Sequence, residues 1–122
     1  MLPETLGELE YLVLLAVKGI QENRDKNAYG VTVFDAINED AERPTKLSAI
    51  YAALARLEKK GYLTSWFGQP TRERGGRAKR FFRIERIGYD ALRRAELSMQ
   101  RLRSLSPAGV AVPELPDGED EG

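Results

Sequence analysis

Apolar residues recur every three or four positions in four stretches of the chain, a pattern typical of helices with one buried face. It predicts helices over Thr5 to Gln21, Ala28 to about Asp40, Leu47 to Gly61 and Glu85 to Ser104. The first of these helices is apolar on more than one face. That width suits a central core helix, and it equally suits a helix that also contacts a second copy of the chain.

The boundaries of the two middle helices are predicted from cap residues. Asn27 is a plausible N-cap for the second helix, and Thr45 and Ser48 compete as N-cap of the third. Gly61 follows two lysines and is expected to end the third helix, because glycine readily takes the left-handed conformation there. Gly30 inside the second helix costs about 1 kcal/mol against alanine, which predicts that another helix crosses closely at that point.

Two stretches rich in β-branched and aromatic residues follow the third helix and predict strands over Leu63 to Gly68 and Lys79 to Ile84. The segment between them, QPTRERGGRA, contains Gly75 and Gly76 and predicts a turn. Four aromatic residues are expected to form the core of this hairpin rather than a stacking surface for bases: Trp66, Phe67, Phe81 and Phe82.

The predicted fold class is mostly α with a small β-hairpin. Three helices followed by a two-stranded hairpin form the winged helix-turn-helix arrangement, in which the third helix enters a DNA major groove and the hairpin tip touches the adjacent backbone or minor groove. We expect this domain over residues 1–85 and a C-terminal dimerisation helix over residues 86–106. Residues 107–122 mix prolines, glycines and acids without periodicity and are expected to form a disordered acidic tail.

The formal net charge is zero, but the charges are segregated along the chain. Residues 43–86 contain 12 lysines and arginines against 3 acids, whereas residues 1–42 contain 3 against 9. Because a nucleic acid responds to the local field, the predicted third helix and hairpin form a candidate surface for a polyanion. A solvated face that serves only solubility is the alternative.

The composition excludes several classes of chemistry. The chain has no cysteine and no histidine, so disulfides, zinc fingers and thiolate or histidine catalysis are excluded. Glu8 and Glu10 point to different sides of one helix and form no catalytic pair. No apolar run approaches the roughly 18 residues of a membrane span. We therefore expect a soluble, cytoplasmic protein that is not an enzyme and has no catalytic residues, metal or cofactor.

Surplus apolar surface predicts a homodimer. The fourth helix is about 20 residues and roughly 30 Å long, which is more than a domain of three short helices can cover. Paired about a two-fold axis, this surface becomes an isologous interface and places two third helices on the same side. The residues expected at the interface are Leu9, Val13, Val17, Leu92, Ala95, Met99 and Leu102.

Four blocks of sequence occur in order along the chain: LGELEYLVLLAV, AYGVTVFDAI, IYAALARLEKKGYL and ERGGRAKRFFRI. Together they resemble the PadR family of bacterial transcriptional regulators. The resemblance covers about four-fifths of the chain and implies a homodimer, joined through the first and last helices, that binds a pseudo-palindromic operator, usually as a repressor. It also implies that Tyr51 approaches the DNA backbone and that the basic wing tip falls on Arg77, Lys79 and Arg80. From its position alone, Tyr51 could equally be half-buried packing beside Ile50.

Base reading requires side chains on the groove face of the third helix, and Lys46, Ser48, Ala49 and Ala52 are the candidates, since an alanine can contact a thymine methyl group. Basic residues on the helix and turn are expected to neutralise phosphates. The full set expected to contact double-stranded DNA is Lys46, Ser48, Ala49, Tyr51, Ala52, Arg56, Arg72, Arg74, Arg77, Lys79 and Arg80.

This chain departs from the pattern of the family in two features. Lys46 stands where many relatives begin the third helix with serine or threonine, and Tyr89 is the only aromatic residue of the fourth helix, which argues against an aromatic effector. The identity of any small-molecule effector is left open. The alternative function is a winged-helix module that binds another protein and not DNA, and it predicts a wing poor in arginine.

Overall fold

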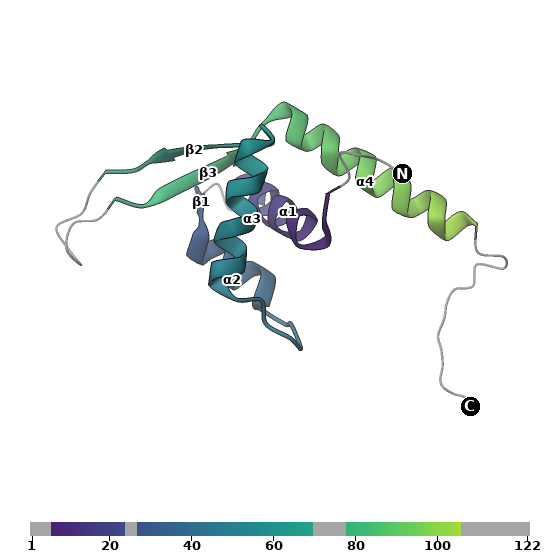
Figure 1. The fold of residues 1–122 in the computed structure, drawn as a ribbon, viewed down its shortest axis with the longest axis horizontal. Helices are drawn as coiled ribbons and strands as arrows, with labels where there is room; N and C mark the ends of the chain where they lie inside the picture. Colours follow the sequence, from purple (N-terminus) through teal and green to yellow (C-terminus); the bar gives the residue numbers. More distant parts are fainter. Residues whose placement is uncertain (1–5, 24–26, 70–77, 106–122) are drawn as a thin grey trace. The chain divides into compact units, whose positions relative to one another are not determined.

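The computed structural model describes residues 6–23, 27–69 and 78–105. Within that part of the chain the elements are α1 Glu8–Asn23, β1 Ala28–Tyr29, α2 Gly30–Asn38, α3 Leu47–Lys59, β2 Leu63–Phe67, β3 Arg80–Ile84 and α4 Arg86–Ser104 (Figure 1). The predicted fold class, mostly α with a small hairpin, is confirmed. The predicted turn between the strands, with Gly75 and Gly76, falls on residues 70–77 and so lies outside the described residues.

The contacts within the chain divide it into two compact units, Met1–Leu92 and Arg93–Gly122. The first unit contains every element up to the first turns of α4. The second unit contains the remaining turns of the same helix, which end at Ser104.

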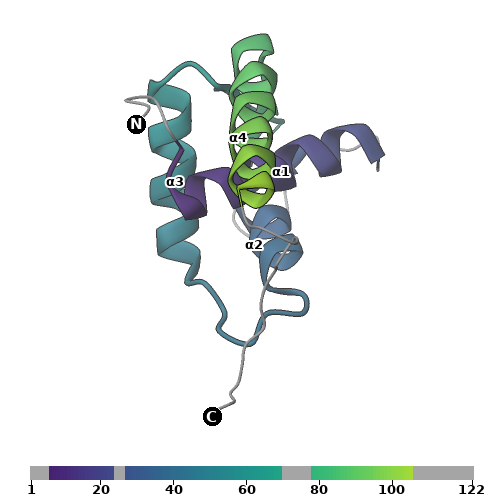
Figure 2. The same ribbon diagram turned by 90° about the vertical axis from the view of Figure 1, so that its right-hand side faces the viewer.

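The core of the first unit lies where α1, α2 and α3 pack against one another and against one face of the sheet (Figures 1 and 2). Apolar residues from each helix and from the strands are fully buried there: Val13, Leu14, Val17, Val33, Ile50, Leu54, Leu57 and Leu63. The central-core interpretation of the first helix is therefore confirmed for this face of α1.

The second predicted helix is wrong at its start. Ala28 and Tyr29 form a short strand, β1, that pairs antiparallel with Phe82 and Phe81 of β3. The helix begins at Gly30, its N-cap is Tyr29 and not Asn27, and the Tyr29 backbone N–H donates to Thr32 Oγ1 at 3.0 Å. The sheet is therefore three-stranded, in the order β1-β3-β2, and not the predicted two-stranded hairpin.

The end of α3 and its first residue, Leu47, were predicted correctly, but the N-cap residue was not. Gly61 has a φ of 84° and its N–H donates to the Glu58 carbonyl, while the Tyr62 N–H donates to the Leu57 carbonyl, so a Schellman motif ends the helix. Its N-cap is Lys46, which makes no side-chain cap. Thr45 is held elsewhere, because the Asn38 side chain bonds both its N–H and its carbonyl.

The register of β2 with β3 decides which aromatic residues are covered. Phe82 pairs with Ser65 on the face toward the core and is buried, whereas Phe81 pairs with Trp66 on the opposite face. Tyr29 meets Phe81 there edge to face, with 5.7 Å between ring centroids. The prediction that Phe67 belongs to the hairpin core is wrong, since 65% of it is exposed at the end of β2.

Two helical glycines should respond oppositely to alanine. A Cβ at Gly88 of α4 would lie 2.5 Å from the Tyr62 carbonyl oxygen, whereas one at Gly19 of α1 would meet nothing closer than 3.9 Å. Gly88→Ala should therefore lower the free energy of unfolding by about 2 kcal/mol through overpacking. Gly19→Ala should raise it by about 0.5–1 kcal/mol through helix propensity. Urea unfolding of the two variants measures both changes, and a Gly88→Ala protein as stable as the wild type would contradict the packing described.

Candidate nucleic-acid interface

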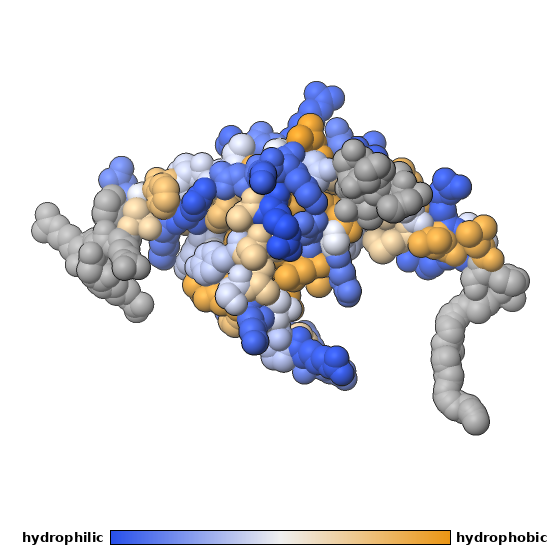
Figure 3. Space-filling view, in the orientation of Figure 1, coloured by the Kyte–Doolittle hydropathy of each residue, from blue (hydrophilic) through white to orange (hydrophobic). Residues whose placement is uncertain are grey.

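One strip of α3 faces away from the core. It consists of Ser48, Ala52, Ala55 and Lys59, all exposed and spaced so that they share one face of the helix. We call these four residues the outer strip. Three of them have short side chains, so the helix backbone can approach the floor of a groove closely. In the space-filling view, pale and tan surface lies beside blue hydrophilic surface in the region where Figure 1 draws α3 (Figure 3).

Lys46 and Ala49 flank the start of the outer strip. Lys46 is exposed at the N-cap position, one turn before Ile50, and Ala49 is half-buried. Of the four residues predicted to read bases, Lys46, Ser48 and Ala52 are therefore exposed and Ala49 is half-buried. Ala55 and Lys59 were missed by the sequence interpretation, although their spacing from Ser48 by seven and eleven residues places them on the same helical face.

Tyr51 of α3 lies on the side of the strip next to α2. A Cβ at Gly30 would lie 2.3 Å from its ring atom Cε1, so only glycine leaves room for the ring. The close approach predicted at Gly30 is confirmed, and it is made by this side chain of the crossing helix. With 47% of its surface exposed, Tyr51 both packs on Gly30 and remains accessible.

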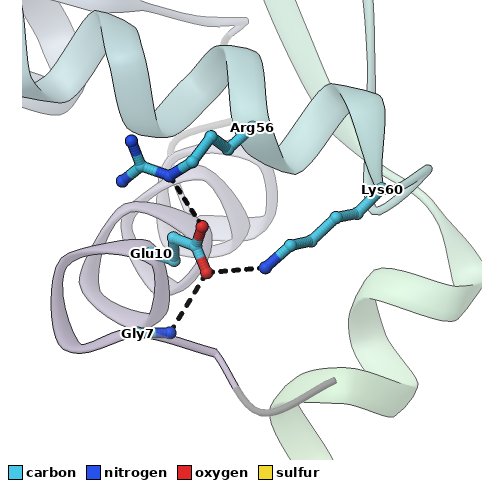
Figure 4. A network of polar contacts seen from close by, with 4 residues as sticks. All are labelled: Gly7, Glu10, Arg56 and Lys60. Atoms are coloured by element: carbon cyan, nitrogen blue, oxygen red, sulfur yellow. Dashed lines mark hydrogen bonds and ion pairs between the residues drawn. The ribbon is translucent and has the colours of Figure 1, made fainter. Parts of the chain in front are cut away.

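On the other side of the strip, a buried carboxylate joins α1 to α3. Glu10 of α1 is only 6% exposed, and three donors surround its carboxylate (Figure 4). Arg56 Nε donates to Oε2 at 2.8 Å, while Lys60 Nζ and the Gly7 N–H donate to Oε1 at 2.8 Å and 3.1 Å. The end of α3 is thereby fixed against the start of α1.

These contacts change the acidity of Glu10. Burial by itself raises the pKa of this carboxyl, but the hydrogen bonds from Lys60, Arg56 and Gly7 outweigh burial and lower the pKa from 4.5 to about 2. Glu10 is therefore ionised across the physiological range. The sequence pattern gave no signal for this contact, because 46 residues separate Glu10 from Arg56.

A second carboxylate braces the hairpin against α3. Arg80 Nη2 donates to Glu58 Oε1 at 2.9 Å, and its Nε donates to Ser65 Oγ at 3.0 Å. Ser65 Oγ in turn donates to Glu58 Oε2 at 2.6 Å. Lys79 lies 4.4 Å from the centroid of the Tyr29 ring, in cation–π contact. Of the predicted wing contacts, Arg80 and Lys79 are thus engaged within the chain, and both remain exposed.

The remaining predicted wing contacts, Arg72, Arg74 and Arg77, lie outside the described residues.

Tyr89, at the start of α4, donates its hydroxyl hydrogen to Glu22 Oε2 of α1 at 2.7 Å. That hydrogen bond lowers the pKa of Glu22 and raises the pKa of Tyr89. The hydroxyl therefore serves to bind α4 to α1.

The residues predicted at a dimer interface differ in their exposure. Val13, Val17 and Leu92 are buried in the core of a single chain, so the prediction is wrong for these three: their side chains are not available to a partner. Leu9 and Ala95 are half-buried, and Met99 and Leu102 are exposed. On α1 the exposed leucines are Leu12 and Leu15, which the sequence interpretation left out of the interface.

No group of three or more acidic side chains among the described residues is arranged to hold a metal ion. Across the same residues, no helix combines the length and the apolar character needed to span a membrane.

Comparison with known proteins places the chain in a family. The model of the "Transcriptional regulator PadR-like family" matches residues 20–94, which is more than half of the chain. The chain therefore belongs to the PadR-like family of transcriptional regulators, and its winged helix is the DNA-binding fold of that family. No curated protein matches the sequence.

Solved structures agree with this assignment. The chain is similar to a PadR family transcription regulator from Clostridium difficile at 19% identity and a TM-score of 0.64, covering 81% of this chain and 94% of that one. A PadR family transcriptional regulator from Eggerthella lenta is 25% identical, with a TM-score of 0.59 and coverage of 78% and 79%. A PadR-like transcriptional regulator from Bacillus cereus is 16% identical, with a TM-score of 0.60 and coverage of 80% and 85%.

The buried carboxylate should make stability depend on pH. Because the folded-state pKa of Glu10 is depressed to about 2, its contribution is fully present above about pH 4.5 and is lost as the pH falls toward 2. Glu10→Gln should lower the free energy of unfolding by about 2 kcal/mol near pH 7, allowing for the partial exposure of Arg56 and Lys60. More than half of that difference should disappear by pH 3.

Urea unfolding at pH 7, 4.5 and 3 measures this dependence. Glu8→Gln is the matched control, since it makes the same charge change on an exposed position of α1, and it should alter stability by less than about 0.5 kcal/mol. An equal effect of the two variants at every pH would contradict the role assigned to Glu10.

Proposed function

We propose that this chain is a repressor that binds a pseudo-palindromic operator in double-stranded DNA as a homodimer. The observation that carries the proposal is the outer strip, in which a helix of the winged-helix fold presents short side chains to solvent. Beside it, Glu10 holds Arg56 and Glu58 holds Arg80. The alternative of a protein-interaction module predicts a wing poor in arginine, whereas this chain has Arg72, Arg74 and Arg77 between β2 and β3, which favours DNA.

Within this proposal, α3 reads bases and its flanks hold phosphates. Lys46 and Ser48 supply hydrogen bonds to base edges, and Ala52 and Ala55 contact thymine methyl groups. The phosphate contacts are assigned to Tyr51, Arg56, Lys59, Arg72, Arg74, Arg77, Lys79 and Arg80. Such contacts fix the position of the protein on the duplex and carry no sequence information directly.

The dimer is proposed from apolar side chains that one chain leaves exposed. Leu12 and Leu15 lie on α1, and Met99 and Leu102 lie on the second unit. Buried against a second copy about a two-fold axis, they would form an isologous interface. Two recognition helices could then read half-sites about 34 Å apart, one turn of DNA. Residues 1–85 would form the DNA-binding domain and residues 86–106 the dimerisation helix, in a protein acting in the bacterial cytoplasm.

DNA binding should weaken steeply with salt. If about five to nine phosphates are neutralised, the logarithm of the association constant should fall against the logarithm of salt concentration with a slope of roughly −4 to −8. A fluorescence-anisotropy titration of labelled genomic duplexes, from 50 mM salt to physiological salt, measures this slope. Flat affinity over that range, or no binding to any duplex, would refute the proposed function.

Dimerisation should depend on the exposed apolar residues Met99 and Leu102 of α4 and not on the C-terminal acidic residues. Ending the chain at Ser106 should leave a dimer, whereas Met99→Lys combined with Leu102→Lys should give a monomer, because two buried charges without partners cost several kcal/mol. These positions are outside the core, so the first unit should stay folded. Light scattering at micromolar concentration reports the mass.

The control for this experiment is Gln100→Lys combined with Ser104→Lys, which adds the same charge to exposed polar positions of the same helix. It should remain dimeric. A monomeric wild type, or a dimeric Met99 and Leu102 variant, would rule out the interface.

A further inference from the structure

We propose that Glu10 is a positioning residue that orients Arg56 as a two-pronged phosphate ligand on the DNA-facing side of α3. The inference rests on the proposed function and deepens it. Its starting point is an asymmetry in one ion pair: the Glu10 side chain is 8% exposed, whereas that of Arg56 is 52% exposed. A buried anion here fixes a cation that stands at the surface.

The carboxylate is a rigid anchor for the guanidinium. Glu10 Oε1 accepts hydrogen bonds from Lys60 and from the backbone N–H of Gly7, and these two bonds hold the carboxylate in one orientation. Oε2 accepts from Nε of Arg56 at 2.8 Å. Binding through Nε fixes the plane of the guanidinium, because this nitrogen lies on one edge of the planar group.

The other edge of the same guanidinium points outward. In Figure 4 the two terminal nitrogens of Arg56 are directed away from Glu10. In the described ranges of the chain, the only hydrogen-bond acceptor of the Arg56 side chain is the Glu10 carboxylate. Two parallel N–H groups on a fixed plane match two oxygens of a phosphate, and such bidentate bonds are among the strongest that proteins make.

The position of Arg56 on α3 fits a backbone contact. Arg56 follows Ala52 by one helical turn and adjoins Ala55, so it lies beside the outer strip and not within it. When a helix sits in the major groove, residues at its flanks meet the sugar-phosphate strands that border the groove. Tyr51 occupies the opposite flank, next to Gly30.

The charge of the cluster also favours an anion. Glu10 cancels one positive charge, and Arg56 and Lys60 supply two, so the group retains one net positive charge. Lys60 therefore offsets the anion that orients Arg56. An arginine held in place loses less conformational entropy when it binds than one that is free in solvent.

The first test removes the phosphate ligand. Arg56→Ala should weaken binding to all duplexes by a similar factor, about tenfold, and should make the salt slope shallower by about one. Arg56→Lys keeps the charge but not the two parallel donors, and should recover only part of the affinity. Wild-type affinity and slope in Arg56→Ala would overturn the inference, while binding by the wild type would leave the proposed function intact.

The second test is a double-mutant cycle between positions 10 and 56. Relative to the charge-matched control Glu8→Gln, Glu10→Gln should weaken DNA binding about threefold, although it removes a negative charge. In an Arg56→Ala background the same substitution should have no such effect, because no guanidinium is left to orient. Thermal melts confirm that each variant is folded at the assay temperature.

The cycle separates positioning from simple structural support. Tighter binding by Glu10→Gln than by Glu8→Gln would show that Glu10 withholds Arg56 from DNA, and this would overturn the inference. Equal losses with and without Arg56 would do the same, since they would reflect general loss of structure. If the wild type and Glu8→Gln bind no duplex at low salt, the proposed function fails and this inference fails with it.

Discussion

The buried carboxylate of Glu10 is the constraint on which the candidate interface depends. A charge removed from water must be surrounded by donors, and here the donors come from the end of α3 and from the backbone before α1. Satisfying this carboxylate fixes the rotation of α3 about its own axis. The apolar residues Ile50, Leu54 and Leu57 impose the same rotation from the core side. When both requirements are met, Ser48, Ala52 and Ala55 face the solvent. The outer strip is thus a consequence of the buried contacts on the other faces of α3.

The features of the fold that were predicted correctly are those with local signals. The four helices show their period within a single stretch of sequence, and Gly61 after Lys59 and Lys60 is a stop signal confined to three residues. β1 could not be predicted in this way, because a strand of two residues has no period and its partner, β3, begins more than 50 residues later. Asn27 failed as a cap for the same reason: pairing of Ala28 and Tyr29 with β3 took the residues on which that helix was expected to begin. Tertiary pairing overrode local propensity at this position.

The candidate site shows a different limit, which concerns charge and not secondary structure. The excess of basic residues between positions 43 and 86 is read directly from the sequence, but a count along the chain cannot show which cations meet carboxylates in space. Glu10 comes from the acidic N-terminal segment and engages Arg56 and Lys60, while Glu58 engages Arg80. Two of the predicted interface residues on α1 failed for a related reason, since a helix that is apolar on several faces does not reveal which face is inside. The structure buries Val13 and Val17 and exposes Leu12 and Leu15.

The short side chains of the outer strip set the way in which this protein can recognise a sequence. The side chains of Ala52 and Ala55 contribute no hydrogen bonds, so under the proposed function the directional contacts from α3 to base edges are assigned to Ser48 and Lys46. A single recognition helix with so few donors discriminates weakly between base pairs, and its affinity must come largely from phosphates. In the proposed homodimer, discrimination is then gained by requiring two half-sites at a fixed separation. A reading helix poor in donors, flanked by arginines held in place, is thus physically consistent with a regulator that recognises spacing as well as sequence.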